Sequence, residues 1–247
     1  MKFWIKLKRA AYRGLIRNRF RIINRKGINY LVNYKNSIDR KLIINGGYEE
    51  DQLAVFSEFV DQYTCTIFYD VGANIGLYSV NVSLLPSIEK TYAFEPASTN
   101  ICQLSANLLL NNLQDSVEIK PFGLSDKEAE VIFLENTGNS TGRSRIKVTN
   151  QNELDTNKFI EKRINVYPLD DISTDKDKNI AIKIDVEGHE ERAIKGMTKL
   201  LGNNYCLLQV ESYDKNAGGI NSLMEGLGYY LLHEIDHDHY YGNFPRA

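Results

Sequence analysis

The segment KIDVEGHE places charged side chains where a buried strand is expected. Lys183, Asp185 and Glu187 fall at alternate positions, so they point to one face of that strand, whereas isoleucine and valine fill the other face. Central parallel strands are normally apolar on both faces, and a buried charge must be paired or functional. A glycine then turns the chain, and His189 opens the next helix. The segment is therefore a candidate for the floor of an active site.

The segment FYDVGANIG predicts a ligand-binding turn between a strand and a helix. Its glycines read GxxxG, which differs from the dinucleotide fingerprint GxGxxG and from the P-loop. Gly72 lets the backbone approach a ligand, and the helix N-terminus offers unpaired N–H groups. Glu95 ends the next strand, where an acid can accept hydrogen bonds from both ribose hydroxyls of an adenosine. This combination favours S-adenosylmethionine, which has a ribose but no pyrophosphate. The candidate cofactor-binding residues of this motif are Gly72 and Glu95, with Ala73 and Gly76 of the same turn.

If S-adenosylmethionine is the donor and an alcohol the acceptor, the charged strand has a defined task. The leaving thioether is neutral and needs no acid, but a base that removes the alcohol proton accelerates attack by ~10² to 10⁴-fold. His189 is one candidate base, because a helix N-terminus favours its neutral form. The carboxylates Asp185 and Glu187 are further catalytic candidates. Alternatively, Asp185, Glu187 and Glu211 hold a divalent metal such as Mg²⁺, which would polarise the acceptor hydroxyl.

Strand and helix signals alternate around these motifs, which predicts an α/β fold with a mostly parallel sheet and helices on both faces. We expect strands at 66–71, 91–94, 117–124, 131–134, 180–186 and 206–210, and helices at 75–85, 98–109 and 190–201. Ser98 is a plausible N-cap, and Gly202 would end the third helix. Residues 136–158 are predicted to form a long loop, and the histidine-rich segment HEIDHDHYYGNF a solvated C-terminal stretch.

Six ordered motifs make the chain resemble the FkbM family of class I S-adenosylmethionine-dependent methyltransferases. They are YDVGANIGLYS, FEP, GLSD, PLDDI, IKIDVEGHEERAIKGM and LLQVES, and the resemblance covers about Gly47 to Tyr213. The family implies a Rossmann-like, doubly wound sheet of seven strands whose last strand is antiparallel and whose first and fourth strands are neighbours. It also implies cofactor contacts from Asp70, Gly72, Asn74 and Glu95, and an adenine contact from Asp126.

The resemblance implies O-methylation, with a hydroxyl of a sugar in a surface glycan or glycolipid as the expected acceptor. A small secondary metabolite is an alternative acceptor, and a non-catalytic nucleoside-binding module is an alternative function. The chain lacks the [ND]PP[YF] turn of enzymes that methylate exocyclic base amines. The segment NTGNSTGRSR is either a surface hairpin or a substrate-binding loop, in which Arg143 or Arg145 would bind an acidic sugar.

Charge is distributed unevenly along the 247 residues. Residues 1–26 contain ten Lys or Arg and no acid, so residues 27–247 carry 20 basic and 32 acidic side chains, a net charge of −12. We predict a basic, partly helical extension at 1–50 and a methyltransferase domain at 51–247. Three cysteines far apart in the sequence argue against a disulfide framework or a zinc site.

The basic N-terminus predicts where the protein resides. Trp4, Leu7, Ala11 and Leu15 recur at roughly helical spacing among basic residues, a pattern that suits an anionic membrane surface. The alternative is a helix that packs on its own domain with its arginines in water. We expect a cytoplasmic protein, peripheral at the inner face of a membrane through residues 1–26, and no nucleic-acid partner.

Overall fold

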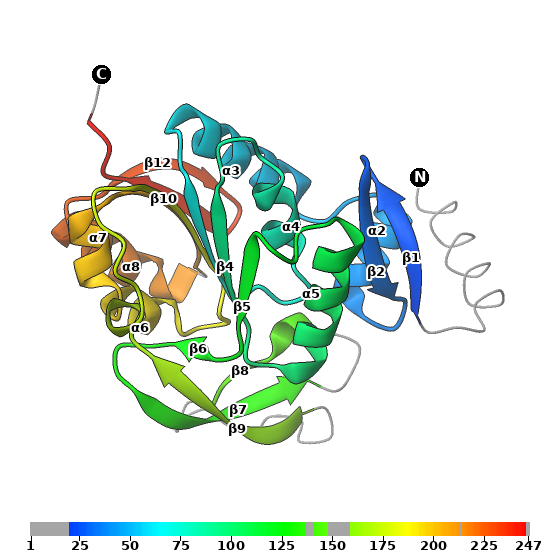
Figure 1. Cartoon of the computed structure of the whole chain (residues 1–247). Helices are drawn as coiled ribbons and strands as arrows, with labels where there is room; N and C mark the ends of the chain where they lie inside the picture. The colour runs from blue at the N-terminus through cyan, green and yellow to red at the C-terminus, as the bar shows by residue number, and fades with distance from the viewer. Residues whose placement is uncertain (1–19, 137–140, 148–158, 213, 246–247) are drawn as a thin grey trace.

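The computed structural model describes residues 20–136, 141–147, 159–212 and 214–245 (Figure 1). The predicted amphipathic helix near Trp4 to Leu15 lies outside the described residues. Within the described residues, no helix combines the length and the apolar character needed to cross a bilayer.

A seven-stranded sheet forms the centre of the molecule, in the order β12-β13-β11-β10-β3-β4-β5. Its strands are β3 (Ile67–Val71), β4 (Lys90–Phe94), β5 (Val117–Lys120), β10 (Asn179–Ile184), β11 (Tyr205–Glu211), β12 (Tyr230–Ile235) and β13 (Asp238–Gly242). β13, the last strand, runs antiparallel to β11 and β12, and β3 and β10 are parallel neighbours. Both features confirm the predicted α/β class and place a topological switch point between β3 and β10, where ligands usually bind.

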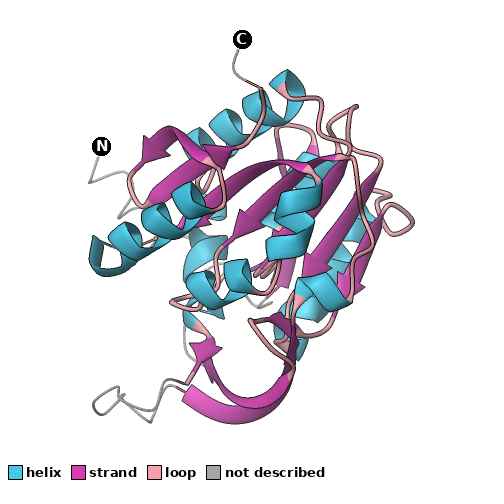
Figure 2. Ribbon diagram, turned by 90° about the vertical axis from the view of Figure 1, so that its left-hand side faces the viewer, coloured by secondary structure: helices cyan, strands magenta, loops and turns pink. Residues whose placement is uncertain are grey.

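Helices cover both faces of this sheet (Figure 2). α3 (Glu50–Gln62), α4 (Leu77–Ser83) and α5 (Ser98–Leu110) contribute to the clusters that contain Phe68 and Ala93 on one face. α6 (Glu190–Lys195), α7 (Thr198–Asn203) and α8 (Asp214–Gly226) lie on the other face, in the cluster that contains Tyr69 and Ile182. Consecutive residues along β3 and β10 are buried. Since neighbouring positions of a strand point to opposite faces, both faces of these strands are buried.

The described part of the N-terminal extension packs onto the main fold. β1 (Phe20–Arg25) and β2 (Ile28–Asn33) form an antiparallel hairpin, and α2 (Ser37–Asn45) follows it. Buried side chains of β2 and α2, including Val32 and Leu42, share a hydrophobic cluster with Leu104 of α5. The boundary at residue 50 between the N-terminal extension and the methyltransferase domain stays a prediction.

A second, four-stranded sheet is inserted between β5 and β10, in the order β6-β9-β7-β8. Its strands are β6 (Gly123–Leu124), β7 (Ala129–Asn136), β8 (Arg145–Ile146) and β9 (Phe159–Tyr167). β7 and β9 form the long curved hairpin at the bottom of Figure 2. The predicted single strand at 117–124 is wrong: the chain leaves the central sheet at Pro121, which has no N–H to donate, and Gly123 begins a strand of the other sheet.

Three further predictions are corrected by the structure. The helix expected at 190–201 is two helices, because the chain breaks at Gly196, where any Cβ would collide with the carbonyl oxygen of Ser125. The N-cap of α5 is Ala97, and Ser98 is already helical. The C-terminal histidine-rich segment is β12 and β13 of the central sheet, and every residue of β13 is buried. Two 3₁₀ turns, η1 (Thr141–Arg143) and η3 (Leu169–Asp171), complete the described elements.

Candidate active site

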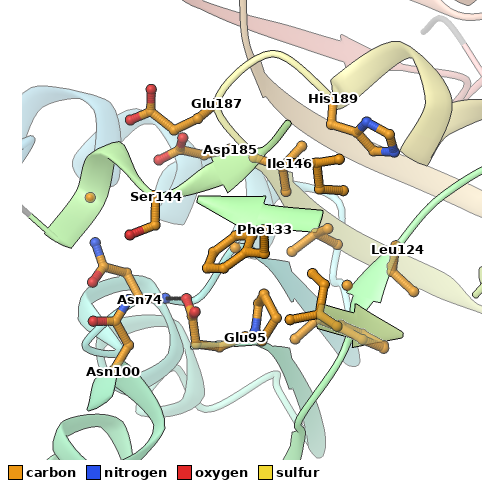
Figure 3. Close-up of a pocket in the computed structure, with 18 residues that line it drawn as sticks. Asn74, Glu95, Asn100, Leu124, Phe133, Ser144, Ile146, Asp185, Glu187 and His189 are labelled. Atoms are coloured by element: carbon orange, nitrogen blue, oxygen red, sulfur yellow. Dashed lines mark hydrogen bonds between the residues drawn. The ribbon is translucent and has the colours of Figure 1, made fainter. Parts of the chain in front are cut away.

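Two adjoining cavities lie at the carboxyl ends of β3, β4 and β10. The Glu95 cavity, with about 630 Å³ of empty space, is the one drawn in Figure 3. The Lys183 cavity has about 1080 Å³ and is lined mostly by polar groups. The two cavities share the lining residues Gly72, Asn74, Gly142, Asp185 and Glu187.

Glu95 is held rigidly in the first cavity. Its side chain is 5% exposed, and its two carboxylate oxygens accept backbone N–H bonds from Asn74 and Ala97, each at 2.8 Å. Burial raises the pKa of Glu95 to about 7, although these two bonds and one from Asn100 lower it. The rest of the wall is largely apolar: Val71, Phe94, Leu124, Phe133, Ile146, Ile164 and Val186. A fixed acid in an apolar cavity suits a flat ligand that carries hydroxyl groups.

The glycines of the turn after β3 have structural reasons of their own. Gly72 has φ +88°, and a Cβ there would collide with the carbonyl oxygen of Asp185. The glycine therefore lets the ends of β3 and β10 approach each other, as well as exposing backbone to the cavity. Gly76, with φ +85°, lines neither cavity; a Cβ there would run into Leu104 of α5. Ala73 lines only the Lys183 cavity.

Lys183 is the centre of a buried charge network. It is 5% exposed, its ammonium lies 2.9 Å from Asp185 Oδ2, and it sits 4.7 Å from the centre of the Tyr78 ring. Burial opposes its charge, but the carboxyl groups of Asp185, Glu49 and Asp70 outweigh burial and raise the pKa of Lys183 well above its usual value. The sequence-based expectation of an ion pair for Lys183 is thus realised with Asp185.

The acids around Lys183 are in different protonation states. Burial disfavours the charge of Asp185, yet Lys183 and a hydrogen bond from Glu211 outweigh it and lower the pKa of Asp185. Burial and the charge of Asp185 raise the pKa of Glu211, which favours a protonated Glu211 that donates a hydrogen bond to Asp185. Burial, Asp185 and Glu190 raise the pKa of Glu187 to about 7, the range in which a general base works best.

His189 lies apart from this acidic group. It lines only the Glu95 cavity, and in Figure 3 its ring points away from Asp185 and Glu187. Its Nε2 is 2.9 Å from Ser125 Oγ, which also donates to Asp126 at 3.0 Å. Burial and the positive charge of Arg192 lower the pKa of His189, which favours the neutral ring. The neutral form was expected from the sequence, but with the helix N-terminus as its cause. Asp126 is exposed and lines neither cavity.

The predicted metal ligands come together in one cavity. Asp185, Glu187 and Glu211 all line the Lys183 cavity. Lys183 is paired with Asp185, and burial raises the pKa of Glu211, so a metal ion there would have to displace the ammonium and lower that pKa; the metal hypothesis for these three acids stays a prediction. In the described part of the chain, no group of three or more His, Cys, Asp or Glu is arranged to hold a metal ion.

The sequence analysis missed several residues that line the cavities. The N-terminal extension lines part of the Lys183 cavity, through Lys41 of α2 and through Tyr48 and Glu49. Asn100 of α5 and Ser144 line the Glu95 cavity. Lys41, Tyr48 and Glu49 precede the first motif and carry no local signal. Asn100 follows Glu95 by five residues, and Ser144 lies in the segment NTGNSTGRSR, so their neighbourhood was noted but not the residues themselves.

The doubly wound fold, with cavities at its switch point, defines a class I methyltransferase architecture. The chain belongs to the FkbM methyltransferase family: the family's "Methyltransferase FkbM domain" matches residues 70–231, more than half of the chain. The predicted resemblance is thereby confirmed.

Two known proteins illustrate the similarity. The chain is 24% identical over 150 residues to the hexuronic acid methyltransferase AglP of Haloferax volcanii, a match that covers 59% of this chain and 56% of that protein. The crystal structure of methyltransferase FkbM from Methylobacillus flagellatus KT is similar with a TM-score of 0.52 and 18% identity, covering 72% of this chain and 44% of that one. The chain thus spans little more than half the length of its curated relative.

Family membership implies S-adenosylmethionine as the methyl donor, and the residues present fit it. Glu95 in its apolar cavity suits an adenosine. Two buried oxygens, Asp70 Oδ1 and Asn74 Oδ1, have no hydrogen-bond partner among the described residues, and both residues line the Lys183 cavity. Unpaired buried acceptors are costly, and the ammonium group of the donor's amino acid would satisfy them.

Proposed function

We propose that this protein transfers a methyl group from S-adenosylmethionine to a hydroxyl of a sugar in a glycan or glycolipid. The observation that carries the proposal is the shared wall of the two cavities. Asp185 and Glu187 face both the apolar cavity of Glu95 and the polar cavity of Lys183. With the donor's nucleoside in the Glu95 cavity and a hydroxyl acceptor entering from the Lys183 cavity, the methyl group and the hydroxyl would meet beside these carboxyl groups. The relative AglP, named for hexuronic acid, supports a sugar as the acceptor.

The donor supplies an electrophilic methyl group on a sulfonium, and its thioether leaves as a neutral group. This chain's residues then have three tasks. Glu95 binds the ribose hydroxyls, Asp70 and Asn74 hold the ammonium group, and the apolar wall keeps water from the nucleoside.

Glu187 is the general base in this proposal. It lines both cavities, and its pKa of about 7 allows it to take the acceptor's hydroxyl proton at neutral pH. Asp185 is a weaker base because Lys183 and Glu211 stabilise its ionised form. His189, the other sequence-based candidate, is hydrogen-bonded to Ser125 on the Glu95 side, which suits a role in holding the donor.

A methyl-transfer screen tests the proposal. The full chain is incubated with S-adenosylmethionine and monosaccharides, uronic acids, secondary-metabolite phenols and surface-glycan fragments, and products are identified by mass spectrometry. We expect an O-methyl sugar. Methylation of amines only, or of phenols with no sugar product, would contradict the proposed acceptor. Identical rates after exhaustive EDTA treatment are expected, because Asp185 is engaged with Lys183.

A further inference from the structure

The mouth of the Lys183 cavity is formed by two segments from distant parts of the chain. α2 contributes Ser37, Ile38 and Lys41, and η1 contributes Gly142 and Arg143. The segments touch: a Cβ on Gly142 would lie 2.7 Å from Ile38 Cδ1. α2 precedes the FkbM domain match, which begins at residue 70. This part of the cavity is therefore built by the N-terminal extension together with the loop inserted after β7.

Lys41 and Arg143 provide two exposed positive charges at this mouth. The ammonium of Lys41 lies 4.3 Å from the centre of the Tyr48 ring, and Tyr48 also lines the cavity. The positive charges of Arg145 and Arg143 both lower the pKa of Glu187, which lines the same cavity as Arg143. Neither cation forms an ion pair with an acid of the described residues, whereas Lys183, inside the cavity, is paired with Asp185.

Charge inside the cavity is arranged in the opposite way. Its inner wall carries the carboxyl groups of Glu49, Asp70, Asp185, Glu187 and Glu211 around the single ammonium of Lys183. An anionic group on a ligand would find Lys183 already paired with Asp185 there, but at the mouth it would meet two cations. An arginine fork beside a lysine is a suitable binding arrangement for a carboxylate or a phosphate.

We propose that Lys41 and Arg143 bind a carboxylate or phosphate carried by the acceptor, so that the acceptor is an acidic or phosphorylated sugar. The anion at the mouth orients the sugar so that a neighbouring hydroxyl faces Glu187. This inference rests on the proposed function and adds the substrate's charge and the two residues that select it.

The test uses the full chain saturated with S-adenosylhomocysteine, and calorimetry with glucuronate, glucose 6-phosphate and glucose as probes. We expect at least one anionic probe to bind about tenfold or more tightly than glucose, since one charge-assisted hydrogen bond is worth about that much. Lys41→Met and Arg143→Met should each remove most of this preference. Lys35→Met, at an exposed lysine that lines neither cavity, is the matched control and should keep it.

Three outcomes would overturn the inference. The first is equal binding of charged and neutral probes, and the second is an anion preference that survives both substitutions. The third is weaker binding of S-adenosylhomocysteine in both variants with unchanged binding of 5′-methylthioadenosine. Because 5′-methylthioadenosine lacks the amino-acid carboxylate, this result would mean that the two cations bind the carboxylate of the donor. If the wild-type protein does not bind S-adenosylhomocysteine at all, the proposed function itself fails, which is a separate result.

Discussion

The protonation of single carboxyl groups determines how this site would work. Glu187 has a pKa of about 7, and as a base it must be ionised, so kcat/KM should fall about tenfold per pH unit below that value. Glu187→Gln should lower kcat/KM by ~10² to 10⁴-fold and remove this acid limb. A pH–rate profile for wild type and variant measures both effects.

The control for this experiment is Glu191→Gln, an exposed acid on α6 that pairs with Lys195. It should keep the wild-type profile. If His189 were the base, the limb would persist in Glu187→Gln and would disappear in His189→Ala with donor binding intact. That pattern would contradict the role of Glu187.

Glu95 makes stability depend on pH in a predictable direction. Its pKa is about 7 in the folded protein and near 4.5 when unfolded, so the fold binds this proton more tightly than the unfolded chain does. The resulting stabilisation is complete below pH 4.5 and is lost as pH rises through about 7. Across this range the free energy of unfolding should fall by on the order of 3 kcal/mol from this group.

Glu95→Gln cannot lose a proton, so urea unfolding of the ligand-free variant should lack this part of the pH dependence. The difference between wild type and variant is the informative quantity, because Glu187 titrates in the same range. Parallel curves for the two proteins would show that burial does not perturb Glu95.

At the residue scale, the sequence predicted part of the site. Glu95 and the turn at Gly72 were identifiable because strand–turn–helix spacing places them at a sheet edge. The location of the His189 side chain could not be predicted from the sequence. Its direction depends on the backbone angles at Gly188 and on the hydrogen bond between His189 and Ser125. The roles of the individual site residues stay predictions.

At the scale of elements, three parallel strands hold the buried network together. Lys183 of β10 lies opposite Asp70 of β3, while Glu211 ends β11. Lys183→Met would leave the buried Asp70 and the partly buried Asp185 without a neighbouring cation and should destabilise the fold by about 3–5 kcal/mol. Glu211→Gln replaces a carboxyl that is already protonated and should be nearly neutral at pH 7.

Chemical denaturation of the ligand-free proteins measures these differences, with the exposed Lys199→Met as control. A loss of stability in Glu211→Gln as large as that in Lys183→Met would mean that Glu211 is ionised in the fold.

The missed elements share a physical cause. β9 reads FIEKRINVY, with most of its side chains exposed, so its pairing with β7 gives no apolar periodicity to detect. β13 is rich in polar and aromatic residues and is buried only because β11 and β12 enclose it. Apolar runs such as β3 and β10, in contrast, were predictable because burial on both faces demands them.

For the whole molecule, the basic N-terminus remains the main prediction about location. Residues 1–26 hold ten positive charges and the rest of the chain a net charge of −12, so an anionic membrane should attract one end only. We expect sedimentation with anionic liposomes at low salt and release at high salt. A variant lacking residues 1–19, which keeps the β1–β2 hairpin, should stay in the supernatant; equal sedimentation of both proteins would refute the prediction.

Donor binding is the most direct test of the account, because it needs no knowledge of the acceptor. Calorimetry of the full chain with S-adenosylhomocysteine should show one site, which NAD does not occupy. Glu95→Ala should weaken binding at least about tenfold, since in the proposed role Glu95 accepts charge-assisted hydrogen bonds from the ribose. Absence of S-adenosylhomocysteine binding by the wild-type protein, or unchanged binding by Glu95→Ala, would contradict the assignment of these cavities to methyl transfer.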